Sequence, residues 1–370
     1  MNKLKIIVVI GTRPEAIKLA PVISLLKQQL HNVVVVSSSQ HKELLLSVFS
    51  IFKIKPKYDL NVMLSSQSSH HIAGNVLIQL EEILKKEKPQ LVIVQGDTTT
   101  ACSGALAAFY SKIPVAHIES GLRTNDIYSP FPEEMNRRII SQIATLNFAP
   151  TKFNKNNLLK EGIPINKIFI TGNTVLDSLK FISNHLSSKK NNYKLDIVND
   201  KKIILITVHR NENFGIPMKN ILNSINEIVN KYEDFKIIFP VHPNPKVKQA
   251  IKKYLKPYER IILKEPMNYI EFINLLSQSF LVMTDSGGIQ EEAPAFGVPV
   301  IILRSSSERG ELISSGGGLI SGTQQEDITN LTSQLIENKV LYKKMTKKSF
   351  PFGKSGASVK IVKIIEKYLL

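Results

Sequence analysis

The sequence of 370 residues predicts an α/β protein made of two doubly wound domains. Short apolar runs of strand length alternate with amphipathic segments of helical length along the whole chain. This alternation is typical of parallel sheets covered by helices. The length exceeds what one hydrophobic core usually supports, so two domains are expected. The polar stretch His185–Lys202 separates the two sets of elements.

In chain order, the predicted strands of the first half are Leu4–Ile10, Val33–Ser37, Leu91–Val94, Pro114–Ile118 and Ile168–Thr171. The helical patterns between them are Ala16–Leu30, Ile72–Lys86 and Ala101–Tyr110. The second half repeats the plan, with strands at Ile203–Thr207, Phe235–Val241, Ile261–Leu263, Phe280–Thr284 and Val298–Leu303. We therefore predict two Rossmann-like domains, residues 1–175 and 176–354. The tail Ser358–Leu370 has a helical apolar stripe, and it packs either on its own domain or on the first.

Composition limits the class of protein. A hydrophobic content of 43% excludes a largely disordered chain. The single cysteine, Cys102, excludes an intramolecular disulfide and is compatible with a reducing cytosol. The apolar run Ile6–Ile10 is too short for a secretion signal and is followed by charged residues. Since no stretch approaches the roughly 18 apolar residues of a membrane span, we expect a cytoplasmic protein without membrane contact.

The formal charge of +17 suggests nucleic-acid binding at first sight. However, the lysines are spread over the whole length, no dense basic helix is present, and aromatic residues are not interleaved with the basic ones. A lysine-rich solvated surface is the better interpretation, and no nucleic-acid partner is expected. The positive field still favours anionic small molecules.

Polar motifs follow the predicted strands in both halves. They are Gly11–Arg13, Gln40–His41, Gly96–Asp97, Glu119, His209, His242 and Asp285–Ser286. In doubly wound sheets, ligands bind beyond the carboxyl ends of the strands. The coincidence across both halves predicts one cleft between the two domains.

The most informative of these motifs follows the apolar run Phe280–Met283. Ser286, Gly287 and Gly288 open a helix, and the free N–H groups and dipole of a helix start bind anions. Glu292 lies one turn further and can accept hydrogen bonds from a ribose diol. The segment therefore predicts a nucleotide pocket. The alternative is a glycine-rich turn with an ordinary surface glutamate.

The segment Gly11–Lys18 is a second candidate anion site. Arg13 stands at the end of the first strand and Lys18 one turn into the following helix, so both can reach a diphosphate. The motif matches neither a dinucleotide-binding glycine loop nor a Walker loop. The alternative is a surface salt-bridge pair.

Carboxylates at strand ends and helix starts indicate acid–base chemistry. Asp97, Glu119 and Glu133 are expected to face one cleft, where one member of a cluster can be protonated while another is ionised. Taken singly, each is equally compatible with a helix cap or a helix-dipole role. His209 could neutralise or protonate a leaving phosphate, or could be a structural residue. No histidine or cysteine pattern of a metal site is present.

Seven motifs in order resemble one family, the non-hydrolysing UDP-N-acetylglucosamine 2-epimerases of bacterial surface-polysaccharide synthesis. The motifs are GTRPEAIKLAP (11–21), QGDTTTA (95–101), HIESGLRT (117–124), YSPFPEEMNRR (128–138), TGNTVLD (171–177), TVHRNEN (207–213) and TDSGGIQEEAPAFGVPV (284–300), followed by Arg304 and Ser307–Arg309. They span nearly the whole chain. The resemblance implies a fold like that of two-domain GT-B glycosyltransferases, with the last helix, residues 355–370, crossing back to the first domain.

The resemblance also implies a homodimer, no metal and no redox cofactor. By similarity, the UDP-binding residues are Arg13, Lys18, Phe272 beside the uracil, Ser286, Gly287, Gly288, Glu292 and Arg309. The catalytic residues that match are Asp97, Glu119, Glu133 and His209. Some members are activated by a second UDP-N-acetylglucosamine, and the positions that match parts of that site are Gln40, His41, Gln67, Glu134 and Arg210.

The sequence departs from the family pattern at a few positions. Asn211 replaces an arginine, Gly310 replaces a proline, Met267 replaces a glutamine before the uracil-facing phenylalanine, and Ser120 replaces an alanine. The expected activity is interconversion of UDP-N-acetylglucosamine and UDP-N-acetylmannosamine through a 2-acetamidoglucal. The alternatives are a hydrolysing epimerase, an epimerase of a related UDP-acetamido sugar, a GT-B glycosyltransferase and a non-catalytic nucleotide-sugar sensor.

Overall fold

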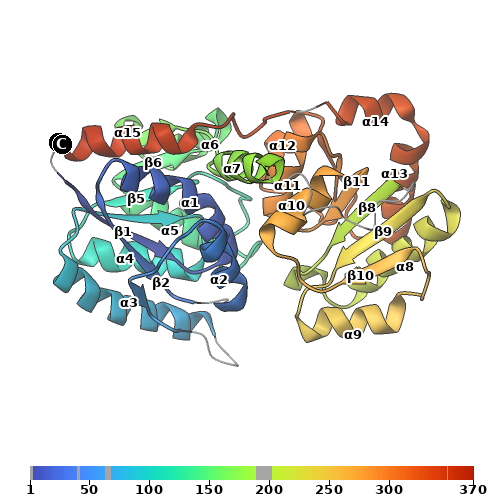
Figure 1. Cartoon of the computed structure of the whole chain (residues 1–370), viewed down its shortest axis with the longest axis horizontal. Coiled ribbons are helices and arrows are strands. Elements are labelled where there is room, and N and C mark those ends of the chain that lie inside the picture. The colour runs from blue at the N-terminus through green and yellow to red at the C-terminus, as the bar shows by residue number, and fades with distance from the viewer. Residues whose placement is uncertain (1–2, 40–41, 63–67, 189–201, 348) are drawn as a thin grey trace. The chain divides into compact units, whose positions relative to one another are not determined.

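The computed structural model describes residues 3–39, 42–62, 68–188, 202–347 and 349–370 (Figure 1). The chain divides into two compact units. The first comprises Met1–Lys180 with Phe352–Leu370, and the second comprises Phe181–Pro351. Each contains one parallel sheet with helices, which confirms the predicted α/β class with two doubly wound sheets.

The sheet of the first unit has seven strands in the order β3-β2-β1-β4-β5-β6-β7. The strands are β1 (Lys5–Ile10), β2 (Asn32–Ser37), β3 (Tyr58–Asp59), β4 (Leu91–Gln95), β5 (Val115–Ile118), β6 (Leu146–Ala149) and β7 (Ile168–Ile170). β1 pairs in parallel with β2 on one side and β4 on the other. Because helices cover both faces, the central strands are buried runs of valine, isoleucine and leucine.

The helical elements of the first unit are α1 (Arg13–Gln28), α2 (Lys42–Ile51), α3 (Ser69–Glu87), α4 (Thr99–Tyr110), α5 (Glu133–Ile143), α6 (Lys152–Lys160), the short 3₁₀ turn η1 (Ile165–Lys167), α7 (Val175–Ser188), which ends in the second unit, and α15 (Ala357–Leu369). α4 packs closely on β1, because Gly104 brings its backbone against Val9. Side chains of α3, α4 and the central strands form one buried core.

The last helix, α15, lies beside α1 in the first unit (Figure 1). The Asp177 carboxylate accepts the backbone N–H of Gly356, together with the N–H and the hydroxyl of Ser358 at 2.8 and 2.7 Å. This carboxylate thereby satisfies N–H groups at the start of α15 that have no partner within the helix. Near the other end, Glu366 lies 3.1 Å from the imidazole of buried His31.

The sheet of the second unit has six strands in the order β10-β9-β8-β11-β12-β13. The strands are β8 (Lys202–Thr207), β9 (Phe235–Pro240), β10 (Ile261–Lys264), β11 (Leu281–Thr284), β12 (Val300–Ile302) and β13 (Gly318–Ile320). The helical elements are η2 (Asn211–Asn213), α8 (Ile216–Lys231), α9 (Pro245–Tyr254), α10 (Tyr269–Ser277), α11 (Gly287–Phe296), α12 (Gly310–Ser314), α13 (Gln325–Glu337) and α14 (Lys339–Met345). A separate core fills this unit.

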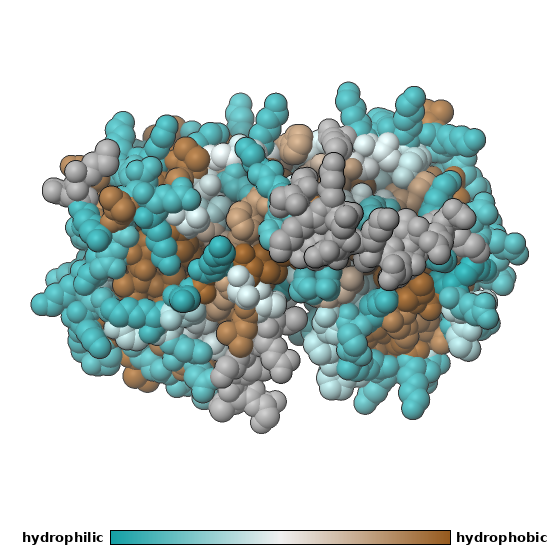
Figure 2. Space-filling view, viewed as in Figure 1, coloured by the Kyte–Doolittle hydropathy of each residue, from teal (hydrophilic) through white to brown (hydrophobic). Residues whose placement is uncertain are grey.

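Hydrophilic side chains cover most of the face seen in Figure 2, with hydrophobic ones in small patches. In the part of the chain that the structure describes, no helix is long and apolar enough to cross a membrane. Three strands, β3, β6 and β13, were not predicted from the sequence. Each has only two to four residues, and in β6 the polar Asn147 interrupts the apolar pattern.

Candidate functional site

Loops at the carboxyl edge of the first sheet lie directly against each other. The loop after β1 begins at Gly11, and the loop after β4 leads into α4. A Cβ atom added to Gly11 would lie 2.6 Å from the Thr100 side chain, so only glycine allows this approach. The Thr100 hydroxyl is 2.9 Å from that of Ser38, which follows β2. The loops after β1 and β2 and the first turn of α4 therefore form one packed layer.

Glu119, the residue after β5, has a left-handed backbone with φ of +66° and is 7% exposed. A residue other than glycine in this conformation costs about 1–3 kcal/mol, and such residues are enriched at active sites. Its carboxylate accepts a hydrogen bond from Gln95 and pairs with the Lys18 ammonium at 2.5 Å. Both side chains of this ion pair are 6% exposed. Lys18, predicted to reach a diphosphate, thus contacts a predicted catalytic carboxylate.

Asp97 lies next to this ion pair. A Cβ atom added to the preceding residue, Gly96, would lie 3.8 Å from the nearer Glu119 oxygen, so the carboxylate of Glu119 packs on the loop that carries Asp97. The Asp97 carboxylate pairs with Arg137, and its backbone carbonyl accepts a hydrogen bond from Asn136 at 2.9 Å. Arg137 and Asn136 both belong to α5, so this helix holds Asp97 at two points.

The first turn of α5 carries Glu133, a member of the predicted catalytic cluster, and Glu134, which matches the predicted activating site. Glu133 is half-buried and lies four residues before Arg137, on the same face of the helix. Glu134 is fully buried and accepts hydrogen bonds from Arg137, Arg138 and the backbone of the loop before the helix. Glu133 therefore lies on the side of α5 that faces Asp97. Glu134 holds the preceding loop by accepting its backbone N–H groups.

Two buried titratable residues of this region did not figure among the predicted site residues. His117, in β5, lies with Nε2 2.8 Å from the Gly96 carbonyl, and burial lowers its pKa to about 4. Glu15, in α1, accepts hydrogen bonds from the loops after β1 and β4. Burial raises the pKa of Glu15 to about 7, and the hydrogen bonds that it accepts oppose this rise. The sequence signal that could have identified Glu15 is its spacing from Thr12, which matches a capping box.

In the second unit, Asp285 organises the loop after β8. This fully buried carboxylate accepts the backbone N–H groups of His209 and Arg210 at 2.9 and 2.8 Å, and the Asn213 amide at 2.9 Å. The His209 ring stacks on that of His242 with 5.1 Å between ring centroids. Its Nδ1 lies 3.5 Å from Asp285, and the side chain is 35% exposed. His209 is therefore fixed in place with part of its ring accessible.

The start of α11 is covered by a guanidinium. A Cβ atom added to Gly287 would lie 2.5 Å from Cζ of Arg309, so glycine is needed for the arginine to lie there. Arg309 also pairs with Glu291 at 2.8 Å and with Glu308. Glu308 pairs in turn with buried Arg304 at 2.9 Å. The structure thus places Arg309 at the helix start beside Gly287, and two carboxylates hold it there.

Glu292 and Phe272 occupy neighbouring helices, α11 and α10. Glu292 is 6% exposed, and its carboxylate accepts the Tyr269 hydroxyl at 2.8 Å. Phe272, one turn further along α10, is also buried. Arg13 is half-buried at the first position of α1. Gln40, His41 and Gln67 lie outside the residues that the structure describes.

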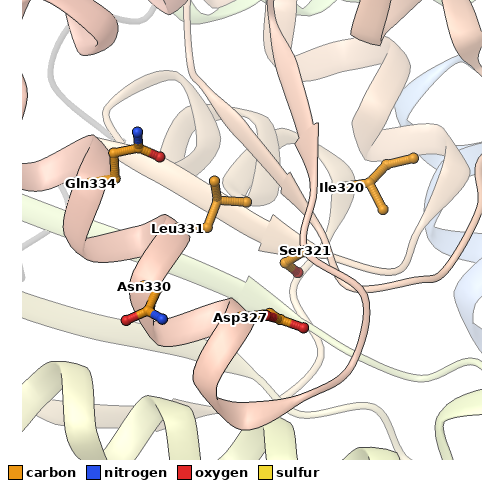
Figure 3. A pocket seen from close by; sticks show the side chains of 6 residues that line it. All are labelled: Ile320, Ser321, Asp327, Asn330, Leu331 and Gln334. Atoms are coloured by element: carbon orange, nitrogen blue, oxygen red, sulfur yellow. The ribbon is translucent and has the colours of Figure 1, made fainter.

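A shallow pocket of about 490 Å³ lies at β13 and α13 of the second unit (Figure 3). Its lining residues are Ile320, Ser321, Asp327, Asn330, Leu331 and Gln334. None of these is a predicted site residue. This pocket is therefore separate from the residues described above.

Comparisons with known proteins give a consistent result. A family described as UDP-N-acetylglucosamine 2-epimerase matches residues 24–366. The chain is 45% identical to the UDP-N-acetylglucosamine 2-epimerase of Bacillus subtilis, over 98% of this chain and 95% of the relative.

Solved structures agree in fold. The structure of S. aureus MnaA with UDP has a TM-score of 0.94 and 44% identity, covering 99% of this chain and 97% of that one. The UDP-GlcNAc 2-epimerase of Neisseria meningitidis bound to UDP-GlcNAc has a TM-score of 0.94 and 45% identity, covering 98% and 100%. The calicheamicin glycosyltransferase CalG4, with 13% identity and a TM-score of 0.61, shares the fold alone.

The low pKa of His117 predicts how stability depends on pH. An unfolded histidine binds a proton below pH 6.5, whereas folded His117 stays neutral down to about pH 4. The neutral His117 therefore makes its full contribution to stability above pH 6.5. This contribution is lost as the pH falls from 6.5 to about 4. The free energy of unfolding, measured by urea denaturation, should fall between pH 7 and pH 5 in the unmodified protein. In His117→Gln this fall should be smaller by about 2 kcal/mol.

The exposed His70 provides the matched control. His70→Gln should follow the pH dependence of the unmodified protein. Equal acid losses for His117→Gln and the unmodified protein would contradict a buried neutral imidazole at position 117.

Proposed function

We propose that this chain, which belongs to the UDP-N-acetylglucosamine 2-epimerase family, interconverts UDP-N-acetylglucosamine and UDP-N-acetylmannosamine without hydrolysis. The observation that carries the proposal is the pairing of two predicted catalytic carboxylates with cations at one sheet edge. Glu119 is paired with Lys18 and Asp97 with Arg137, and Glu119 packs on the loop that carries Asp97. Such a cluster suits an enzyme that moves protons to and from one carbon atom.

The chemistry at carbon 2 requires a leaving group. The proton on this carbon is a poor acid, because no adjacent carbonyl group stabilises the resulting anion. In the proposed elimination, a base takes this proton, a carbon 1–carbon 2 double bond forms, and the bond from carbon 1 to the phosphate oxygen breaks. UDP leaves with that electron pair, and 2-acetamidoglucal remains. Re-addition of UDP to carbon 1, with protonation of carbon 2 from the other face, completes the inversion.

The proton transfers are assigned to the first unit. Asp97, Glu119 and Glu133 supply the base and the acid on opposite faces of the sugar. Support comes from the left-handed backbone of Glu119 and from the placement of Glu133 and Arg137 on one face of α5.

Binding of UDP is assigned mainly to the second unit. The N–H groups at Ser286–Gly288 and the guanidinium of Arg309 would stabilise the departing diphosphate, with His209 beside it. Glu292 would accept the ribose hydroxyls, and Phe272 would contact the uracil. Arg13 and Lys18 of the first unit complete the proposed set. Support comes from two solved relatives, one with UDP bound and one with UDP-GlcNAc bound.

The same resemblance supports a cytoplasmic homodimer that makes a precursor of a bacterial surface polysaccharide. No metal or redox cofactor enters the proposed reaction. The rival activities make different products. A hydrolysing epimerase releases N-acetylmannosamine and UDP, a glycosyltransferase consumes an acceptor, and a sensor binds without turnover. An epimerase of a related UDP-acetamido sugar would prefer that sugar.

Proton exchange at carbon 2 tests the proposed function. Incubated with UDP-N-acetylglucosamine in heavy water, the protein should place deuterium at carbon 2 of both epimers, because that C–H bond breaks in every turnover. Proton NMR should show both products with UDP still attached. Free N-acetylmannosamine as the main product would assign a hydrolysing enzyme instead, and binding without exchange would assign a sensor.

Activation by a second UDP-N-acetylglucosamine is the regulatory part of the proposal. Of the matching positions, Arg210 has its backbone N–H held by Asp285, and Glu134 fastens the loop before α5. Asn211, exposed in η2, stands where the family has an arginine. A diphosphate that meets fewer cations should bind more weakly, since a charge-assisted hydrogen bond contributes about 1.5–3 kcal/mol.

Kinetics from the UDP-N-acetylmannosamine side test this regulation. The reaction should start slowly and accelerate when a little UDP-N-acetylglucosamine is added. Asn211→Arg should lower the half-activating concentration roughly tenfold. Asn330→Arg adds the same charge at the exposed pocket of α13 and should change nothing. Hyperbolic kinetics without acceleration would show that the activating site is absent.

A further inference from the structure

Glu15 accepts hydrogen bonds from two different loops of the first unit. One oxygen, Oε2, accepts the backbone N–H groups of Gly11 and Thr12 at 2.9 and 2.5 Å and the Thr12 hydroxyl at 2.8 Å. The other oxygen, Oε1, accepts the Thr98 hydroxyl at 2.8 Å. The residue is 1% exposed, so water does not replace these donors.

The contacts of Oε2 are those expected of a glutamate in the first turn of a helix. A capping glutamate satisfies N–H groups at the start of its own helix, and one oxygen is sufficient for that. The second oxygen instead reaches Thr98, 83 residues away in the sequence. Burying a carboxylate is costly unless hydrogen bonds satisfy it, and the Thr98 hydroxyl satisfies the second oxygen.

Thr98 transmits the link to the start of α4. Its hydroxyl donates to Glu15 and accepts the backbone N–H of Ala101 at 3.0 Å, so one oxygen is both the partner of Glu15 and the N-cap of α4. Asp97 is the residue directly before it. The backbone of Asp97 is therefore held by α5 through Asn136 and, on its other side, by Glu15 through Thr98.

The same carboxylate fixes the start of α1. Thr12, which gives both its N–H and its hydroxyl to Glu15, directly precedes Arg13. The close approach of Gly11 to Thr100 shows that the loop after β1 also packs on the first turn of α4. One side chain thus sets the position of a predicted diphosphate-binding arginine relative to a predicted catalytic carboxylate.

We propose that Glu15, through Thr98, is a positioning residue that aligns Asp97 with Arg13 for the elimination of UDP. This inference rests on the proposed function, because it gives Glu15 a role in that reaction. Glu15 itself does not touch the reacting atoms in this account. A misplacement of a reacting group by about 1 Å can cost about 100-fold in rate, so the link affects turnover more than binding.

The test uses Thr98, whose hydroxyl can be removed without introducing a charge. Thr98→Val should lower kcat for epimerisation by about 10- to 100-fold, with the affinity for UDP within about threefold of the unmodified protein. Thr98→Ser keeps the hydroxyl and should restore kcat. Thr151→Val removes the N-cap hydroxyl of α6 elsewhere in the same unit, so it controls for loss of a helix cap alone.

A second measurement does not depend on activity. Amide hydrogen exchange at residues 10–15 should be roughly tenfold faster in Thr98→Val than in Thr151→Val, because removal of the Thr98 hydroxyl loosens the carboxylate that holds the other loop. Unchanged exchange at residues 10–15, or a kcat as high in Thr98→Val as in Thr151→Val, would overturn the inference. Absence of epimerisation by the unmodified protein would refute the proposed function, while the exchange result would still decide the link.

Discussion

The ion pair between Lys18 and Glu119 links helix α1 to the end of β5 across 101 residues of sequence. Both groups are buried, and a buried ion that loses its partner destabilises a protein by about 3–5 kcal/mol. The pair can form only because β1, β4 and β5 are neighbours in the sheet, so their loops meet at one edge. The same edge brings Arg137 to Asp97. Pairing of charges at this edge therefore sets where the proposed catalytic carboxylates lie.

The second unit obeys the same constraint with different residues. One oxygen of buried Asp285 accepts the backbone N–H groups of His209 and Arg210. Arg309 lies at the start of α11 between Glu291 and Glu308. A guanidinium held by two carboxylates is oriented before any anion arrives, which reduces the ordering cost of binding. Each unit thus uses buried charges to fix side chains that the proposed reaction needs.

The sequence alone predicted the alternating plan and most of the longer strands, because buried parallel strands are continuous apolar runs. It missed β6, whose Asn147 interrupts the apolar pattern. It also predicted that Lys18 would reach a diphosphate, but not that its ammonium contacts Glu119. A sequence shows which residue stands one turn into a helix, whereas the partner across the sheet edge depends on strand order. The link from Glu15 to Thr98 was beyond prediction for the same reason.

In the proposed reaction the first unit moves protons while the second supplies most of the UDP-binding contacts, and paired variants test this division most directly. Glu119→Gln and Asp97→Asn should lower kcat by about 10²–10⁴, the usual contribution of general acid–base catalysis, while calorimetry shows UDP affinity within a few fold. Glu292→Ala should instead weaken UDP binding, with a smaller effect on kcat, because a ribose contact is made equally in ground and transition states. Thermal melting confirms that each variant is folded. Near-normal kcat in both folded carboxylate variants, or equal losses of UDP affinity in all three, would contradict the account.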